Sequence, residues 1–268
     1  MKISKFIRKK LFILSINFPL LIVGGFLFNS QNPLLVISQR VHASEKIIKK
    51  DFYFYFDRGK KKQESDDYKG SISDFTEAIK IKPDHAMVFF ERAKTKEFAG
   101  YKNGALDDYN TAIEKNVTNP MFFNERGILR FKLGDFLGSI SDYSMSIKLE
   151  PTNADLYFNR GVSRKSLNDN LGALNDFSKA ISINPLVPKF YMNRAITKDH
   201  MNDYKGAISD YEKGIELDPE NKHIFYNLGV TQLDAGEIDK ACSSFLKASK
   251  FDYLFLEDTL NTNCYKYV

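Results

Sequence analysis

The stretch ADLYFNRGVSRKSLNDNLGALNDFSKAISINPLV, residues 154–187, decides the fold, because its pattern returns every 34 residues along the chain. Self-similarity at a fixed period of this length is the signature of stacked supersecondary units. Small residues such as Gly161 and Ala173 let two helices approach closely, and Pro185 prevents the second helix from continuing. Each unit is therefore predicted to form a helix, a short turn, a second helix and a stop.

Columns of small and aromatic residues carry this repeat along the chain. The small residues of the first helix are Gly59, Ala93, Gly127, Gly161, Ala195 and Gly229. The aromatic residues of the first helix are Tyr55, Phe89, Phe123, Tyr157, Tyr191 and Phe225. Those of the second helix are Phe75, Tyr109, Tyr143, Phe177, Tyr211 and Phe245. We expect these rings to fill the space between the two helices and toward the next unit.

These columns resemble the tetratricopeptide repeat family, and the unit that contains Tyr157, Gly161, Ala173, Phe177 and Pro185 follows that family's pattern nearly throughout. The resemblance implies an all-α, right-handed superhelical solenoid of six antiparallel helix-turn-helix repeats. Its units are 52–85, 86–119, 120–153, 154–187, 188–221 and 222–255. One unit alone buries too little apolar surface to offset its conformational entropy, so the array should fold as a stack. Residues 256–268 are expected to cover the last unit.

Arginine and aspartate recur together in five units and disappear together in the sixth. The pairs are Arg58 and Asp74, Arg92 and Asp108, Arg126 and Asp142, Arg160 and Asp176, and Arg194 and Asp210. The sixth unit has Leu228 and Ser244 at these places. A half-buried charge needs a partner, and arginine suits bidentate pairing with a carboxylate. We predict an ion-pair ladder that joins the helices; the alternative is duplication with both side chains in solvent.

The first helices of stacked hairpins are expected to line a concave groove. One column there changes from acids to amides: Asp57, Glu91, Glu125, Asn159, Asn193 and Asn227. Its neighbour would supply apolar and aromatic pockets: Phe56, Phe90, Asn124, Phe158, Met192 and Tyr226. An asparagine amide can pair with both N–H and C=O of a bound backbone. This predicts a peptide-binding groove whose acidic half prefers basic segments; in the alternative, asparagine is simply the residue common at this place in the family.

The N-terminal residues 1–43 are typical of an export signal or a membrane anchor. Six basic residues and no acid occur there, and the run Leu11–Phe28 is largely apolar. That run is about 27 Å long as a helix, which suits an anchor, whereas Val41-His42-Ala43 suits signal cleavage near Ala43. We favour cleavage, and in both cases expect repeats outside the cytoplasm, in a periplasm or lumen. Residues 44–51 would form a linker.

The charge balance argues against a nucleic-acid partner. Removing the six leader residues from the 39 basic residues leaves 33, against 34 acidic residues. A nucleic-acid binder should carry a basic surface on its folded domain. The four histidines have no metal-ligand or catalytic spacing, and no phosphate-binding loop occurs. We therefore predict no catalytic residue, no metal and no cofactor.

Two cysteines leave one question open. Cys242 and Cys264 are able to form a disulfide that pins the tail over the last unit, since an exported chain is exposed to oxidation. Alternatively, Cys242 is a small buried apolar residue, because it replaces the Ile or Leu of the other five units. The replacement favours the second interpretation.

The expected function is a non-catalytic protein–protein interaction scaffold that binds a peptide or partner helix, in the assembly of a membrane complex. One alternative is a membrane-tethered organiser that associates with the bilayer through Leu11–Phe28. Another is an accessory subunit that docks the substrate of an enzyme. The sequence names neither the partner nor the oligomeric state.

Overall fold

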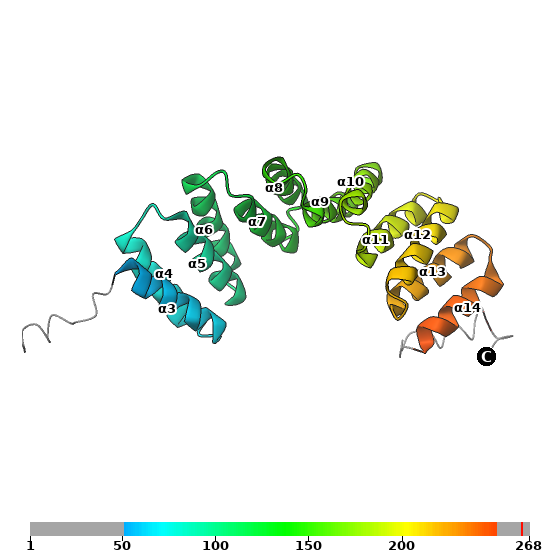
Figure 1. Cartoon of the computed structure of the whole chain (residues 1–268), viewed down its shortest axis with the longest axis horizontal. Coiled ribbons are helices and arrows are strands. Elements are labelled where there is room, and N and C mark those ends of the chain that lie inside the picture. The colour runs from blue at the N-terminus through cyan, green and yellow to red at the C-terminus, as the bar shows by residue number, and fades with distance from the viewer. Residues whose placement is uncertain (1–50, 251–263, 265–268) are drawn as a thin grey trace, which may run out of the picture. The chain divides into compact units, whose positions relative to one another are not determined.

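The computed structural model describes residues 51–250 and Cys264, and within them it holds twelve α-helices and no strand. The helices form six antiparallel hairpins that follow one another along the chain (Figure 1). The hairpins are α3 (Phe52–Glu64) with α4 (Tyr68–Ile81), α5 (Ala86–Phe98) with α6 (Lys102–Lys115), α7 (Pro120–Lys132) with α8 (Phe136–Leu149), α9 (Ala154–Ser166) with α10 (Asn170–Ile183), α11 (Pro188–His200) with α12 (Tyr204–Leu217), and α13 (Lys222–Asp234) with α14 (Ile238–Ser249). The predicted all-α repeat solenoid is confirmed.

Each hairpin begins at the first residue of a predicted unit. The proposed leader, nearly all of the linker and, except for Cys264, the predicted cap at 256–268 lie outside the described residues.

The turn inside every hairpin uses one left-handed residue. That residue is Asp66, Gly100, Gly134, Asn168, Asn202 or Gly236, with φ between 61° and 84°. The backbone N–H of the following residue bonds to a carbonyl five positions back, as from Asp135 to Arg130 at 2.9 Å. This is the bonding of a Schellman motif, which satisfies the last carbonyls of the first helix. Glycine, asparagine and aspartate occupy the left-handed position because they tolerate positive φ best.

An aspartate–glycine pair then starts the second helix in four repeats. In the third repeat the Asp135 carboxylate accepts a hydrogen bond from the Gly138 N–H at 2.9 Å. A side chain at Gly138 would not fit, because its Cβ would lie 2.0 Å from the Asp135 Oδ2. The same arrangement recurs at Asp67, Asp169 and Asp203. A cap of this kind stabilises a helix by about 1 kcal/mol.

The core of each hairpin is the aromatic ring of its second helix. These six rings are between 0% and 2% exposed: Phe75, Tyr109, Tyr143, Phe177, Tyr211 and Phe245. Each lies against the small residue of the first helix, and a Cβ at Gly161 would come within 2.7 Å of the Phe177 ring. The small column is therefore needed for the close approach of the two helices.

The first helices form a continuous face. The second helices α4, α6, α8, α10 and α12 each pack between their own first helix and the first helix of the next repeat. First helices of neighbouring repeats also contact each other, as α3 contacts α5 and α7 contacts α9, and α9, α11 and α13 continue the row. In Figure 1, α7, α9 and α11 lie on one side of the array and α8, α10 and α12 on the other. We call the side formed by α3, α5, α7, α9, α11 and α13 the first-helix face.

Candidate functional site

The predicted amide column is present on the first-helix face with free hydrogen-bonding capacity. Asn159, Asn193 and Asn227 are half-buried. The Asn193 side chain donates to the Lys189 carbonyl at 2.9 Å, while the amides of Asn159 and Asn227 bond to no other described side chain or backbone group. These carboxamides are therefore able to accept from and donate to a peptide backbone.

Acids gather on the N-terminal half of the same face. Asp57 is exposed, whereas Glu91 is only 9% exposed and lies 3.6 Å from the Lys94 ammonium. Burial raises the pKa of the Glu125 carboxyl, and Lys94 and the Asn124 amide, which donates to it at 3.2 Å, partly oppose that rise. Burial also raises the pKa of the Tyr109 hydroxyl, and three nearby glutamates raise it further: Glu91, Glu97 and Glu125.

Glu97 belongs to this group but is absent from the predicted groove columns. Its carboxylate accepts from the Tyr109 hydroxyl at 3.4 Å and pairs with Lys132 of the next first helix at 2.8 Å. Glu97 occupies the twelfth place of its repeat, where the other units have Gln63, Phe131, Lys165, Asp199 and Leu233. Charged residues at three of these six places, namely Glu97, Lys165 and Asp199, were the available signal.

The predicted aromatic column needs a correction. Phe90 is 1% exposed, with its ring stacked 4.9 Å from the Phe122 ring of the next repeat, so it lines no open pocket. Phe158 is half-buried, and its ring packs against Phe177 and Phe190. The other members, namely Phe56, Asn124, Met192 and Tyr226, are half-buried. Phe90 and Phe158 therefore join consecutive hairpins, because their rings meet Phe122 and Phe190 of the next repeat.

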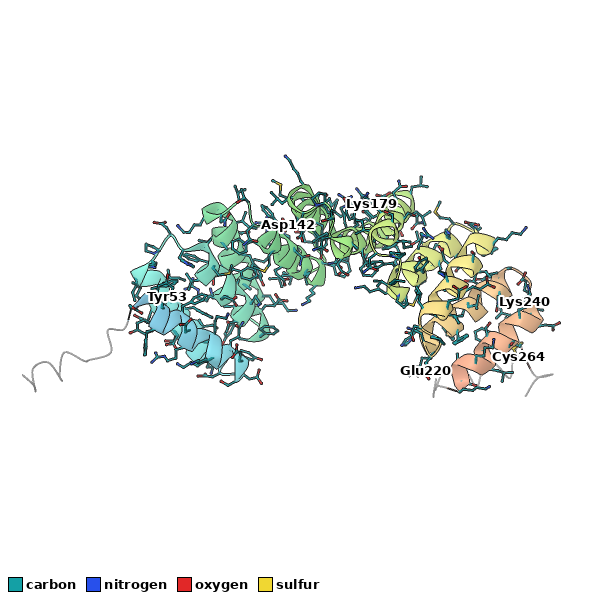
Figure 2. All side chains as sticks on the ribbon, in the orientation of Figure 1. Tyr53, Asp142, Lys179, Glu220, Lys240 and Cys264 are labelled. Atoms are coloured by element: carbon teal, nitrogen blue, oxygen red, sulfur yellow. A yellow bond between two sulfur atoms is a disulfide. The ribbon has the colours of Figure 1, made fainter. Side chains whose placement is uncertain are left out.

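The structure contains the predicted Arg–Asp pairing in all five repeats. Arginine Nε donates to one carboxylate oxygen at 2.7–3.0 Å, and Nη2 donates to the other at 2.5–2.7 Å. The aspartate side chains are between 2% and 7% exposed. Asp142, labelled in Figure 2, accepts both of these bonds from Arg126. The pairs join the first and second helices of one repeat.

A second cation completes each of these groups. Lys62, Lys96, Arg130, Arg164 and Lys198 lie 2.7–2.9 Å from the same five aspartates. The sixth repeat has a neutral version with Leu228, in which the Ser244 hydroxyl donates to the Gln232 side-chain Oε1 at 2.7 Å. Three positions therefore change together, of which the sequence prediction had identified two.

The remaining arginine nitrogen connects consecutive repeats. Nη1 of Arg92 donates to the Thr76 hydroxyl of the previous repeat at 3.0 Å. Arg126 bonds to Asn110, Arg160 to Ser144 and Arg194 to Ser178 in the same way, at 2.8–3.2 Å. The ladder thus fixes both the hairpin and the stacking of hairpins, and it holds the first-helix face in place.

The cysteines are joined, which corrects the favoured interpretation. Cys242 and Cys264 form a disulfide with a Cα–Cα distance of 5.5 Å. Cys264 is 1% exposed and lies beside α14 (Figure 2). The bond holds this part of the C-terminal tail against the last repeat.

The described residues hold neither a metal-binding cluster nor a membrane-spanning helix. No group of three His, Cys, Asp or Glu residues there has the arrangement of a metal site. None of the helices between residues 51 and 250 has the length and apolar character needed to cross a bilayer.

Comparisons with known proteins agree with this geometry. Residues 154–185 match the family model described as Tetratricopeptide repeat, and residues 201–236 match one described as TPR repeat. Comparison with curated proteins finds no significant match.

Several solved structures share the fold at low identity. YrrB, described as a TPR protein with an unusual peptide-binding site, is 19% identical over 70% of this chain and 97% of its own, with a TM-score of 0.61. PilF of Pseudomonas aeruginosa is 15% identical over 79% of this chain and 96% of its own, with a TM-score of 0.64. MamA of Desulfovibrio magneticus is 18% identical over 63% of this chain and 96% of its own, with a TM-score of 0.60. Two segments of the chain thus match tetratricopeptide repeat models, and its six in-phase hairpins have the fold of these structures.

Proposed function

We propose that this chain is a non-catalytic interaction scaffold that binds a segment of a partner protein on its first-helix face. The observation that carries this proposal is the row of half-buried amides at Asn159, Asn193 and Asn227, two of which bond to no described group. Buried polar groups of a rigid surface favour a ligand that satisfies them. The peptide-binding site named for YrrB, a protein of the same fold, supports the same kind of partner.

The acidic half of the face adds a preference to this proposal. Glu91, Glu97 and Glu125 concentrate negative charge around Tyr109. Complementary charge speeds association and suppresses wrong partners. We expect the N-terminal half of the face to favour basic segments, and the amide half to hold backbone.

A binding selection with the full-length chain tests the proposal. The probe is a display library of random 12-residue peptides, and enriched peptides are then titrated. The variant Asn159→Ala/Asn193→Ala should weaken their binding at least tenfold. The matched control Lys179→Ala changes an exposed residue on the second helix α10 and should change binding less than twofold. Equal losses in the two variants would place binding elsewhere.

The proposed location is outside the cytoplasm, as a soluble scaffold or one tethered through Leu11–Phe28. The basic start and apolar run of the leader support export. Expression in a bacterial host, fractionation and mass measurement of the N-terminus test this. A soluble exported protein that begins near Ser44 supports a free scaffold, an intact leader in the membrane fraction supports a tethered organiser, and retention in the cytoplasm contradicts export.

Co-purification tests the third candidate. Stoichiometric recovery with one enzyme would favour an accessory docking subunit, and that enzyme's activity would then depend on the asparagine row.

A further inference from the structure

Two equivalent places on the first-helix face are built differently. Between repeats two and three, the Glu97 carboxylate is neutralised by Lys132, the thirteenth residue of the next first helix, at 2.8 Å. Between repeats five and six, Asp199 takes the place of Glu97, and the thirteenth residue of the next first helix is Asp234. Asp234 therefore occupies the position at which Lys132 supplies the cation between repeats two and three.

The missing cation leaves a partly buried carboxylate with a hydroxyl neighbour and no positive partner. Oδ1 of Asp199 and Oγ1 of Thr231 are both shielded from solvent and make no hydrogen bond of standard geometry with any described group. Thr231 is 1% exposed, and it lies next to the buried hydroxyl of Tyr211. Burial raises the pKa of Asp199, Asp234 raises it further, and Thr231 and His200 oppose the rise. The Thr231 hydroxyl is a neighbouring donor, but no Lys or Arg of the described residues forms an ion pair with Asp199. Buried carboxylates are normally paired, so this junction lacks a cation.

A complementary charge lies one repeat earlier at the same place. Lys165, in the last turn of α9, is half-buried, and its ammonium has no hydrogen bond or ion pair with any described residue. Burial lowers the pKa of this lysine, and no acid acts against that effect. Lys165 and Asp199 lie on neighbouring first helices, at equivalent positions, and no interaction joins them.

We propose that Asp199 forms a subsite for a lysine or arginine side chain of the partner segment, and that Lys165 binds an acidic side chain of the same segment. This proposal rests on the proposed function, because it assigns the chemistry of the ligand on the first-helix face. Packed helices lie about 10 Å apart, and an extended chain advances about 3.4 Å per residue. The partner therefore carries a basic and an acidic residue about three positions apart.

The peptide selection described above, again with the full-length chain, tests this assignment. Wild-type protein should enrich peptides that pair Lys or Arg with Asp or Glu about three positions apart. Asp199→Asn should weaken a selected peptide at least tenfold, and replacing that peptide's basic residue with glutamine should cause no further loss in this variant. Lys165→Gln should behave in the same way toward the acidic residue. The controls Glu114→Gln and Lys179→Gln remove exposed charges from second helices and should change affinity less than twofold.

The possible outcomes separate this inference from the proposed function. Peptides that depend on Asn159 and Asn193 but show no basic–acidic pair would overturn the inference and leave the scaffold function standing. A selection that enriches nothing, or only peptides insensitive to the asparagines, would overturn both. Enrichment of the pair with the predicted sensitivity supports both.

Thermal unfolding supplies a second readout without any ligand. Asp199→Asn removes a partly buried carboxylate that forms no ion pair with a Lys or Arg of the described residues, so the midpoint temperature should stay the same or rise. Glu97→Gln breaks the pair with Lys132 and should lower it. A fall in Asp199→Asn as large as that in Glu97→Gln would show that Asp199 is structural and would contradict the inference.

Discussion

The substitution Asp142→Asn tests how far the charged ladder stabilises the array. Asp142 accepts two bonds from Arg126 and one from Arg130, and 2% of its side chain is exposed. Asparagine keeps the shape but leaves the Arg126 guanidinium without a counter-charge, and Arg130 keeps only Asp135, at 3.6 Å. Removing one partner from a buried pair costs about 3–5 kcal/mol. The guanidinium groups keep 14% and 25% of their surface exposed, so we expect the low end, about 3 kcal/mol.

The chain provides its own control for this experiment. Arg126→Leu/Arg130→Gln/Asp142→Ser copies the neutral set of the sixth repeat, which is Leu228, Gln232 and Ser244. Replacing a complete buried ionic group by a matched neutral one is often nearly neutral. The triple variant should therefore be more stable than the single variant.

Urea unfolding followed by circular dichroism measures the total effect, and native-state hydrogen exchange locates it. Repeat arrays open by neighbouring units, so exchange should accelerate most in α7 and α8. A loss below about 1 kcal/mol for Asp142→Asn, or a larger loss in the triple variant, would refute the reasoning.

Three further predictions concern single groups. The folded pKa of Glu125 lies above its unfolded value of 4.5, so its neutral form favours folding; that contribution is complete below pH 4.5 and is lost as pH rises through the folded pKa. Glu125→Gln should therefore raise the free energy of unfolding at pH 7. In this variant the free energy of unfolding should also increase less than in wild type as the pH is lowered. Denaturation at several pH values that shows no difference between the two proteins would contradict this. The Cys242–Cys264 disulfide closes a loop of 22 residues. Its reduction should lower the free energy of unfolding by about 3 kcal/mol in wild type but not in Cys264→Ser. Urea unfolding with and without a reductant measures this. Asp203→Ala removes the hydrogen bond to the Gly206 N–H and should cost about 1 kcal/mol in urea unfolding, with faster exchange confined to the start of α12; an unchanged midpoint would show that this cap contributes nothing.

Most of the fold could be predicted from the sequence because the fold is periodic. Small and aromatic columns fix which faces of two helices meet, and the joint loss of arginine and aspartate in the sixth unit identified a contact sixteen residues apart. The second cation of each group was missed because both lysine and arginine occur at that place, as in Lys96 and Arg130. A column of mixed basic residues looks the same in the sequence as ordinary surface charge. Periodicity states that two residues are equivalent but not how deeply each is buried.

The site was harder to predict than the fold, because equivalent positions differ in burial. Phe90 and Asn124 occupy equivalent places, yet only Phe90 is fully enclosed, because its ring meets Phe122 of the next repeat. Asp199 and Glu97 are equivalent too, and their difference depends on a residue of the following helix. The disulfide includes Cys264, which lies beyond the repeats, so no column could predict its partner.

The central claim is that a partner segment lies on the first-helix face, and site-specific photo-crosslinking of a selected peptide tests it most directly. A photoreactive residue would replace Ser166, which is exposed in the last turn of α9, or Lys179, which is exposed on α10. The account predicts that the peptide crosslinks to the protein from position 166 and not from position 179. Crosslinking from position 179 alone would contradict it.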